Sequence, residues 1–598
     1  DTGAETGRGF VPVGTEGDGN HFTGTLDGQG HTIYGLKINR PTLGGVGLFG
    51  YGEGVSNLGL IDVDITGDDY VGGLAGNNYG NISNSYVTGS VRGNGSVGGL
   101  VGWTSDESAI SGSFSSAAVL GSDEEVGGLV GYNQGSIRYS YATGNVAGDD
   151  EVGGLVGSND GGAITNSYAT GNVTGTGASV GGLVGYNYDG GSITNSYAIG
   201  SVDGSDDVGG LVGYNDGSIS NTYATGAVSG ITNEGGLVGF NDGGTVSGSF
   251  WDTDTTGQNN AIGYDDGDSS FLVGLSTQAF LNEDNFTSET DSNNDTNANW
   301  DFTSGTGTWF MVDGETRPFL QSEYSTTITN SHQLQLMAMD LNADYTLANN
   351  IDMSAAFNNV SGMWVTSSST GSGFVPVGSA SYGNQFTGSL DGQNNTITGL
   401  TINRPTSNNV GLFGYGDASI SNVGLINATI TANSSVGGMV GYNLGSISNS
   451  YVTGSVIGET NVGGLVGFND NGSINRSYAT GIVSGDSGVG GLVGLNEGSS
   501  ISNSYAAVSV IGTDYAAGGL VGSNLGYAII TNSYAIGNVS GYESVGGLVG
   551  DNDNSTISNT YATGAVLGNT QTGGLVGYND RGTVENSFWD TDTSGQLN

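Results

Sequence analysis

The sequence predicts an all-β protein, a right-handed parallel β-solenoid in two duplicated blocks with a bridging segment between them. Three observations lead to this prediction. A short motif recurs every 26 to 29 residues, the composition is rich in glycine and lacks helical periodicity, and a longer repeat relates the two halves of the chain.

The short motif is V-G-G-L-V-G with small variations. Polar turns rich in Asn, Asp and Gly separate it from a second apolar run that reads S-I-S-N-S-Y-A-T-G-N-V or similar. Such runs indicate strands and turns, and one period accommodates about three short strands, so stacking at about 4.8 Å gives one coil per repeat. The motif begins at Val71, Val97, Val126, Val152, Val180, Val208 and Glu234, and again at Val436, Val462, Val489, Ala517, Val545 and Thr572.

Recurring apolar positions predict the inside of each coil. Leucine recurs in the motif, as at Leu129 and Leu155, and isoleucine recurs in the second run, as at Ile137 and Ile164. A tyrosine column (Tyr141, Tyr168, Tyr197, Tyr223) becomes phenylalanine at Phe114, Phe250 and Phe588, so we expect its rings to pack and its hydroxyls to be dispensable. An asparagine column suggests an amide ladder, but Tyr139 and Arg476 interrupt it, which favours a corner open to solvent. It contains Asn84, Asn166, Asn195, Asn221, Asn449, Asn503, Asn532 and Asn559.

Composition and charge exclude several classes of protein. The 598 residues include 116 Gly, 5 Pro and no Cys, without a collagen-like period. There are 57 acidic and 9 basic residues, a net charge of -48, so the surface repels nucleic acid and anionic membranes. No apolar stretch approaches the roughly 18 to 20 residues that span a bilayer. We therefore expect no nucleic-acid partner and no membrane insertion.

The longer repeat defines three parts. Residues 9–14 return at 373–378, residues 22–29 return as a close variant at 386–393, and F-W-D-T-D at 250–254 returns at 588–592. We predict a first solenoid block at residues 1–258, a bridge of different structure at 259–345, and a second solenoid block at 346–598.

A family resemblance rests on three elements of this sequence. These are the V-G-G-L-V-G-Y-N plus S-Y-A-T-G-x-V unit, the opening coils at residues 22–41 and 386–405, and the F-W-D-T-D-T motif that ends each block. The chain resembles the GLUG-repeat proteins, which are similar to filamentous-haemagglutinin-type surface proteins of bacteria and also occur among archaeal surface proteins. The resemblance covers both blocks. It implies an extracellular, cell-surface location and a role in adhesion or surface structure.

Catalytic chemistry finds little support in the residues. Enzymes on parallel β-helices that degrade polysaccharides need carboxylates next to cations, and nine basic residues are spread over this chain. The second block replaces His21 and His31 by Gln385 and Asn395. We predict no catalytic residue. A polysaccharide-active enzyme and an ice-binding surface on the column of Thr88, Thr143, Thr170 and Thr225 remain minor alternatives.

Acidic turns are the candidate metal site. They precede the motif in successive or nearby coils, and oxygen-rich turns suit Ca²⁺, whereas the alternative is a solvated acidic edge. If the turns form a solvated acidic edge, the protein requires no cofactor. The second block has fewer carboxylates in these turns. The candidate calcium ligands are Asp68, Asp69, Asp123, Glu124, Glu125, Asp149, Asp150, Glu151, Asp206 and Asp207, with the D-x-D pairs Asp252 and Asp254, and Asp590 and Asp592.

Four sequons are candidate glycosylation sites in a secreted protein: Asn172, Asn285, Asn427 and Asn538. From all of this we predict a non-catalytic, adhesin-like stalk or binding surface. Its partners would be glycans, a cell surface or other copies of itself. The alternative is a subunit of an extracellular filament assembled end to end.

Overall fold

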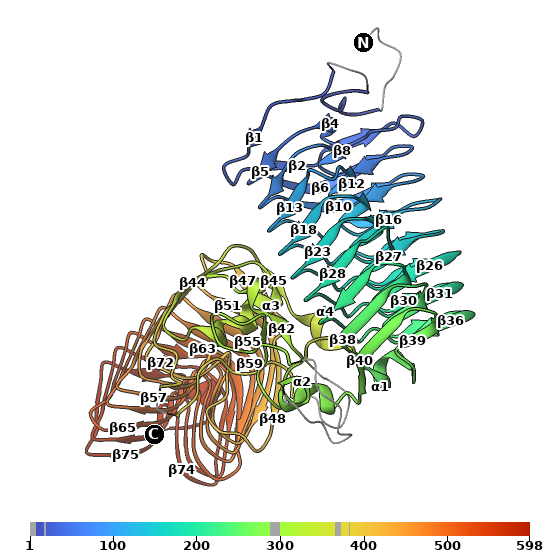
Figure 1. Cartoon of the computed structure of the whole chain (residues 1–598). Coiled ribbons are helices and arrows are strands. Elements are labelled where there is room, and N and C mark those ends of the chain that lie inside the picture. The colour runs from blue at the N-terminus through green and yellow to red at the C-terminus, as the bar shows by residue number, and fades with distance from the viewer. Residues whose placement is uncertain (1–7, 17–19, 288–298, 365–371, 382, 598) are drawn as a thin grey trace. The chain divides into compact units, whose positions relative to one another are not determined.

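The computed structural model describes residues 8–16, 20–287, 299–364, 372–381 and 383–597, and nearly all of their regular structure is β-strand (Figure 1). Strands in successive coils pair in parallel, so the predicted parallel β-solenoid of about twenty coils is confirmed. The chain divides into two compact units. Unit 1 comprises residues 1–322 and 361–363, and unit 2 comprises residues 323–360 and 364–598.

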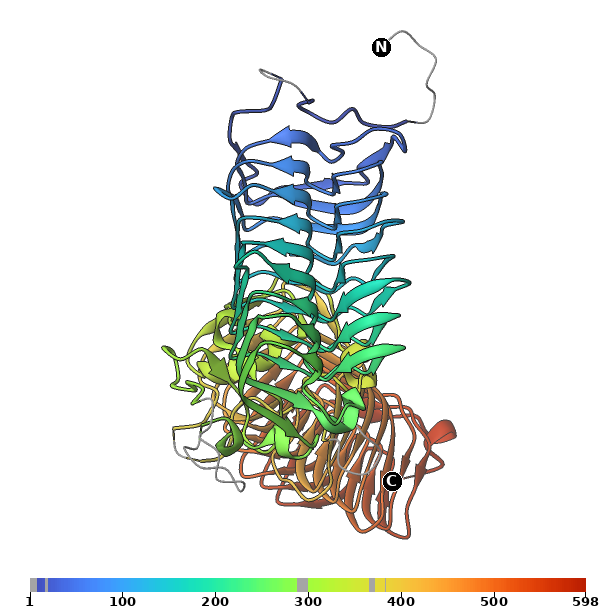
Figure 2. The ribbon, with the colours of Figure 1, turned by 45° about the vertical axis from the view of Figure 1, so that its right-hand side comes forward.

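One coil of unit 1 illustrates the repeat. It contains five short strands, β21 (Val152–Gly153), β22 (Val156–Asp160), β23 (Ala163–Thr165), β24 (Tyr168–Ala169) and β25 (Val173–Gly175). Each pairs in parallel with its counterpart in the next coil, β26 (Ala178–Gly181) to β30 (Val202–Asp203). The sequence predicted about three strands, and the difference arises because Gly154 and the left-handed corner at Asn166 break the longer runs. Figure 2 shows these coils stacked in the blue-to-green part of the chain.

The V-G-Y-N strands form one continuous ladder in each unit. In unit 1 the ladder is β4 (Phe49–Gly52), β8 (Ala75–Asn78), β12 (Val101–Thr104), β17 (Val130–Asn133), β22, β27 (Val184–Tyr188), β32 (Val212–Asn215), β37 (Val238–Asn241) and β39 (Ile262–Asp265). In unit 2 it is β49 (Phe413–Gly416), β53 (Val440–Asn443), β57 (Val466–Asp470), β61 (Val493–Glu497), β65 (Val521–Leu525), β70 (Val549–Asp553) and β75 (Val576–Asp580).

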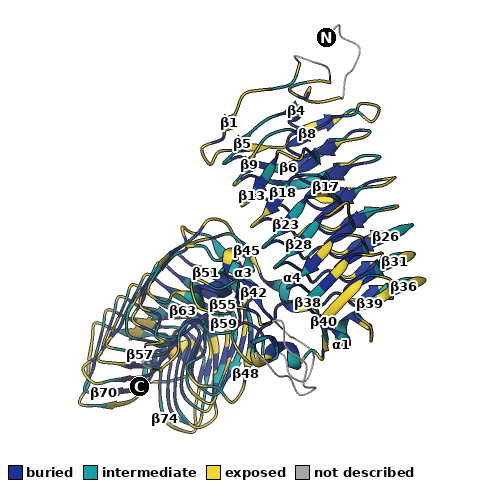
Figure 3. Ribbon diagram, in the orientation of Figure 1, coloured by how far each residue is buried: buried dark blue, intermediate teal, exposed yellow. Residues whose placement is uncertain are grey.

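The core lies inside the coils, where the buried residues of Figure 3 are concentrated. Leu129 and Ile137 are fully buried, as the apolar columns predicted, and Val126 and Val130 are fully buried beside them. Glycine allows the coil to be this narrow: a Cβ on Gly154 would lie 2.1 Å from the carbonyl oxygen of Gly182 in the next coil. Backbone packs on backbone at this corner, so a side chain does not fit.

A buried ladder of asparagine side chains runs through each unit. In unit 1 the Nδ2 of Asn159 donates to the Oδ1 of Asn187 at 2.8 Å, and the pattern repeats in neighbouring coils until Asn241 donates to Asp265. Unit 2 has the same ladder from Asn443 to Asn579. Because each amide donates to one neighbour and accepts from the other, the asparagines of the ladder satisfy one another inside the coil.

The segment after Trp251 first extends the solenoid and then leaves it. The helix α1 (Thr253–Thr256) turns the chain, after which β39 pairs with β37 and β40 (Asp268–Leu275) pairs with β38 (Thr245–Asp252). Short elements follow, namely η1 (Ala279–Leu281), α2 (Asp284–Thr287), and the antiparallel pair β41 (Trp309–Phe310) and β42 (Phe319–Leu320).

Unit 2 opens with elements of its own. These are β43 (Thr327–Ile328), α3 (Ser331–Leu336), η3 (Met337–Met339), β44 (Asp344–Leu347), β45 (Ile351–Asp352) and α4 (Ser354–Asn358). The strand β44 pairs with β46 (Ser389–Asp391), and β45 pairs with β47 (Thr396–Thr398). The strands β46 and β47 begin the coils that follow. The last element is α5 (Thr591–Ser594), the counterpart of α1.

Candidate functional site

The acidic turns of unit 1 lie before the V-G strands, as predicted, and bond to neighbouring coils. Asp69 Oδ1 accepts from the backbone N–H of Gly95 at 3.1 Å, and Asp150 Oδ1 accepts from that of Ala178 at 2.5 Å. Asp207 Oδ1 accepts from Asn233 Nδ2 at 2.7 Å. These carboxylates therefore already have protein donors that connect one coil to the next.

Two glutamates in these turns have shifted proton affinities. Glu125 and Glu151 occupy left-handed backbone positions, with φ of 65° and 52°. Burial, followed by the repulsion of nearby carboxylates, raises the pKa of Glu151 to about 7. Burial also raises the pKa of Glu125, while Ser96 donates a hydrogen bond to its carboxylate. Protonation is thus one way in which this edge reduces its own charge.

Calcium is held by about six to eight oxygen ligands around one point, usually with carboxylates among them. Among the residues that the structure describes, no group of three or more His, Asp or Glu side chains is placed to hold a metal ion. The candidate ligands lie along an edge, each bonded to its own neighbours. Calcium binding by these turns stays a prediction, and chelation tests it.

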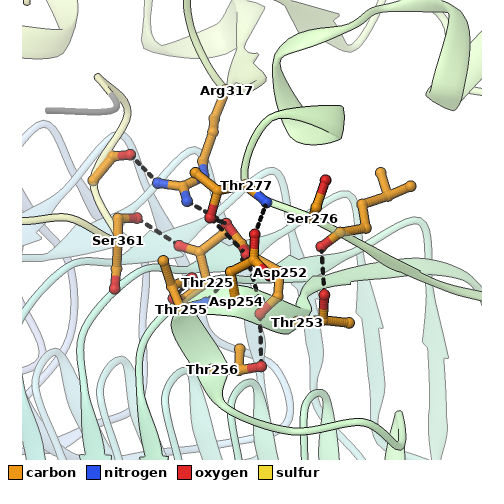
Figure 4. A network of polar contacts seen from close by, with 12 residues as sticks. Thr225, Asp252, Thr253, Asp254, Thr255, Thr256, Ser276, Thr277, Arg317 and Ser361 are labelled. Carbon is orange, nitrogen blue, oxygen red and sulfur yellow. Dashed lines mark hydrogen bonds and ion pairs between the residues drawn. The ribbon is translucent and has the colours of Figure 1, made fainter. Parts of the chain in front are cut away.

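The first D-x-D pair belongs to a polar network, drawn in Figure 4, in which Asp252 is buried and Asp254 is exposed. Asp252 is fully buried and caps α1, because its Oδ1 accepts from the backbone N–H groups of Asp254 and Thr255 at 3.0 and 3.2 Å. The guanidinium of Arg317, also fully buried, donates to Asp252 Oδ2. Thr277 donates its hydroxyl to the same carboxylate at 2.9 Å and its backbone N–H to Asp254 Oδ2 at 3.0 Å.

Sequence reasoning missed Arg317 as the partner of Asp252. Arg317 also donates to the carbonyl oxygen of Gly362, and Thr225 donates its hydroxyl to the carbonyl oxygen of Ser361 at 2.6 Å. The available signal was that Arg317 is one of nine basic residues and belongs to the aromatic bridge. In this network Asp252 positions polypeptide segments, and both partners of the ion pair are closed off from solvent.

The second D-x-D pair has the same local structure. Asp590 caps α5, with Oδ1 accepting from the N–H groups of Asp592 and Thr593 at 2.9 and 3.2 Å. Here the neighbouring Phe588 is 70% exposed, whereas its counterpart Phe250 is fully buried. The duplicated motif therefore forms the same capped turn in both units, but the aromatic residue beside the turn is buried in unit 1 and exposed in unit 2.

The tyrosine column forms a stacked row on the outer face of each solenoid. In unit 1, rings from Tyr86 to Tyr223 stack with centroids 4.8 to 4.9 Å apart and planes within 5° of parallel. In unit 2, rings from Tyr451 to Tyr561 stack at 4.7 to 4.9 Å. The prediction that these rings pack is confirmed, and the packing is against each other along the rod.

Aromatic residues of the bridge cover the end of the row in unit 1. Trp309 lies 5.7 Å from Tyr223 between ring centroids, and Trp300 meets Phe250 edge to face at 4.9 Å. The hydroxyl of Tyr223 donates to the carbonyl oxygen of Pro318 at 2.7 Å. Tyr168, Tyr197 and Tyr223 are consequently buried.

The asparagine column identified in the sequence occupies a left-handed corner. Asn166, Asn195 and Asn221 have φ of 48 to 53°, and Tyr139 and Arg476, which interrupt the column, have φ of 53° and 50°. Tyr139 is 50% exposed. The corner was predicted correctly, but the continuous amide ladder belongs to the asparagine of V-G-Y-N.

The remaining candidates are placed as follows. Asn172, Asn427 and Asn538 are exposed, whereas Asn285 is half-buried and donates to the carbonyl oxygen of Ala279 at 2.9 Å. The ring of His21 stacks on the rings of Tyr51 and Tyr79. Within the described ranges, no helix has the length and apolar character needed to cross a membrane.

Comparison with known proteins identifies the repeat. The GLUG motif matches ten segments, residues 67–92, 122–147, 151–174, 176–203, 204–229, 432–457, 458–484, 485–511, 513–540 and 541–567. The chain thus contains ten GLUG motifs. The ten matches fall on the solenoid coils of both units, so the GLUG motif corresponds here to one coil.

Relatives share segments of this chain. Halomucin of Haloquadratum walsbyi is 44% identical over 117 residues, which are 19% of this chain and 1% of halomucin. An immunoglobulin A1 protease of Streptococcus sanguinis is 38% identical over 121 residues, 18% of this chain and 6% of that protein. The matches thus span a small part of either relative.

A solved structure from Bacteroides ovatus, that of a candidate immunoglobulin A1 protease, also matches. It is 22% identical, with a TM-score of 0.28, and the match covers 46% of this chain and 75% of that one.

Proposed function

We propose that this chain is a non-catalytic, adhesin-like stalk or binding surface at the outside of a cell. The observation that carries the proposal is the regularity of the coils. The same residue types recur in register over both units, and the buried polar groups bond to the equivalent groups of the next coil. Such a repeat presents the same kinds of side chain in coil after coil and therefore forms an extended surface.

The electrostatics support a non-catalytic role. An acid paired with a cation is the arrangement that hydrolytic chemistry uses, and in unit 1 Asp252 and Arg317 form such a pair with both side chains at 0% exposure. A substrate cannot reach them without unfolding the bridge. Asp64 pairs with Lys37 and Arg92 at an exposed position. The carboxylates of the turns before the V-G strands form an acidic edge in a protein with a net charge of -48, which suits solubility and separation from neighbours.

The relatives support an extracellular location. One of them is named for immunoglobulin A1, an antibody found outside cells. Three of the four sequons expose their asparagine, which is compatible with glycosylation on a secreted protein. Glycans, a cell surface and other copies of the chain are the partners we propose, with an extracellular filament as the second candidate function.

Two experiments test the proposal. Antibodies against the recombinant chain, with immunogold electron microscopy of intact source cells, should label the surface as tethered rods. Continuous fibres of uniform width would favour the filament, and label confined to the cytoplasm would exclude both candidates. Turnover on a panel of polysaccharides and peptides, abolished by substituting one carboxylate, would show that the chain is an enzyme.

A further inference from the structure

The outer side of the V-G-Y-N strands in unit 1 forms a row of aromatic rings. In β27, β32 and β37 the asparagine is buried and the residue before it is partly exposed, as expected when side chains alternate along a strand. Strand register aligns this second position through the whole ladder. We call the aligned positions the ladder face. They are Tyr51, Asn77, Trp103, Tyr132, Ser158, Tyr186, Tyr214, Phe240 and Tyr264.

Neighbouring rings of the ladder face make a continuous aromatic surface. Tyr186 meets Tyr214 edge to face at 4.7 Å between ring centroids, and Tyr214 stacks on Phe240 at 5.1 Å. Phe240 stacks on Tyr264 at 4.8 Å, and Tyr188 stacks on Tyr186 at 4.5 Å. Tyr264 is 51% exposed and the other rings are half-buried. Each ring therefore keeps part of its surface in contact with solvent.

Carboxylates lie beside these rings. An aspartate follows the ring position by two residues in three successive coils, and Asp216, Asp242 and Asp266 are all exposed in the turns after their strands. The hydroxyl of Tyr214 donates to the carboxylate of Asp242 in the next coil. Aromatic rings and hydrogen-bond acceptors are thus next to each other along the face.

The ladder face also contains a polar donor without a partner. Asn77 takes the ring position between Tyr51 and Trp103 and is 5% exposed. Among the residues that the structure describes, none accepts a hydrogen bond from its Nδ2. A buried donor without an acceptor costs free energy, so an oxygen brought by a ligand would stabilise this position.

A carbohydrate has the chemistry that matches these features. The face of a pyranose ring presents C–H groups that pack on an aromatic ring, and its edge has hydroxyls that donate to carboxylates and accept from amides. Charge narrows the class of sugar. The carboxylates of Asp216 and Asp242, in a chain with a net charge of -48, repel sugar acids and leave neutral sugars unaffected.

The repeat favours a polymer over a single sugar. Strands of the ladder are about 4.8 Å apart, so equivalent groups recur at that spacing along the face. A linear chain contacts several of these groups at once, and each contact after the first is intramolecular. Weak contacts at single coils therefore add up for a polymer.

We propose that the ladder face of unit 1 binds a linear, uncharged polysaccharide. Sugar rings pack on Tyr186 and Tyr214, sugar hydroxyls donate to Asp216 and Asp242, and a sugar oxygen accepts from Asn77. The inference specifies one class of ligand for the binding surface proposed above, and it rests on that proposal.

Affinity electrophoresis of the full chain tests the proposal, with hydroxyethylcellulose or galactomannan in the gel as neutral probes and polygalacturonate as the anionic one. We expect a neutral polymer to retard the chain and polygalacturonate to leave it unretarded. Replacing both rings, by Tyr186→Ser and Tyr214→Ser, should weaken retention by about tenfold or more. Serine occurs in the same row at Ser158, and an unchanged unfolding temperature shows that the variant folds.

Two matched controls accompany these variants. Tyr139→Asn removes an aromatic ring that is 50% exposed but lies outside the ladder face, at a left-handed corner where asparagine is the usual residue. It should be retarded like the parent chain. Asp216→Ala should weaken retention several-fold, whereas Asp203→Ala, which removes the same charge at an exposed position on another strand, should not.

The proposal is overturned if neither neutral polymer retards the chain, if polygalacturonate retards it equally, or if the double serine variant behaves like Tyr139→Asn. Release of the bound chain by a lysine-rich peptide, without release by neutral oligosaccharides, would make the occupant a cationic polypeptide and also overturn it. Each of these results leaves the surface location to be decided by the labelling of cells. Absence of surface label would in turn leave the measured binding intact.

Discussion

Arg317 and Asp252 form an ion pair whose two side chains are both fully excluded from solvent, although 64 residues separate them in the chain. The carboxylate also caps α1 and accepts from Thr277, and the guanidinium reaches the carbonyl oxygen of Gly362. One pair therefore connects the last coil of the solenoid, the strand that extends it and the aromatic bridge of unit 1.

Arg317→Gln should destabilise unit 1, because it leaves the buried carboxylate of Asp252 without its cation. Removing one partner of a buried pair costs about 3–5 kcal/mol. Calorimetry of the full chain should show one unfolding transition at a lower temperature, and increased amide exchange in residues 253–320 should accompany it. Arg581→Gln is the matched control, since the Arg581 side chain is 67% exposed and its loss should leave the unfolding temperature nearly unchanged. Equal effects of the two substitutions would contradict a structural role for the pair.

The ion pair illustrates what the sequence does not reveal. A period of 26 to 29 residues predicts which positions stack, so the strands, the core columns and the tyrosine row follow from it. Arg317 lies in a segment without a period, and its contact with Asp252 depends on how the chain folds back after leaving the solenoid. Neither residue carries a local signal for the other.

The asparagine ladder shows a second limit. Both asparagine columns have the same period, and a period alone does not distinguish a side chain inside the coil from one at a corner. The residue types that replace asparagine in each column distinguish the two columns. The corner column admits Tyr139 and Arg476, whereas the V-G-Y-N column admits small groups such as Thr104 and Asp265, which continue the hydrogen bonds.

Stability should depend on pH through Glu151. Burial raises its pKa to about 7 from an ordinary value of 4.5, so the folded chain holds this proton more tightly than the unfolded chain. The stability that the Glu151 carboxyl contributes to the folded chain is fully present below pH 4.5 and is lost as the pH rises through 7. Glu151→Gln should therefore be more stable than the parent at pH 8, by about 1–3 kcal/mol, and equal to it near pH 4.

Urea unfolding of the Glu151→Gln variant and the parent at both pH values measures this difference. Glu107→Gln, at an exposed position, is the control and should show no pH-dependent gain. A Glu151→Gln variant that tracks the parent at every pH would show that the folded carboxyl titrates normally.

Chelation should discriminate between the two interpretations of the acidic turns. Asp69, Asp150 and Asp207 already accept from donors one coil away, so we expect EDTA to leave the melting temperature of unit 1 unchanged. Re-addition of CaCl₂ and MgCl₂ separates a calcium effect from general screening. A drop confined to unit 1 and restored by CaCl₂ alone would instead support bridging calcium, because ligands that bind the folded state stabilise it.

The buried ladder should be sensitive to the removal of a single amide. Asn187 accepts from Asn159 at 2.8 Å and donates to Asn215 at 2.8 Å, with no exposure to solvent. Asn187→Ala removes the acceptor of one Asn159 amide hydrogen and the side-chain donor to Asn215 Oδ1, so each neighbour keeps only its bond to a backbone group, Gly162 O and Gly217 N–H. An unsatisfied buried group costs about 1–3 kcal/mol, so we expect a loss of about 2–6 kcal/mol. Thr174→Ala, at an exposed strand position, is the control. Because each amide links two coils, hydrogen exchange should rise in the coils on both sides of Asn187. Exchange that rises in its own coil alone would show that the amides act independently and do not form a continuous ladder.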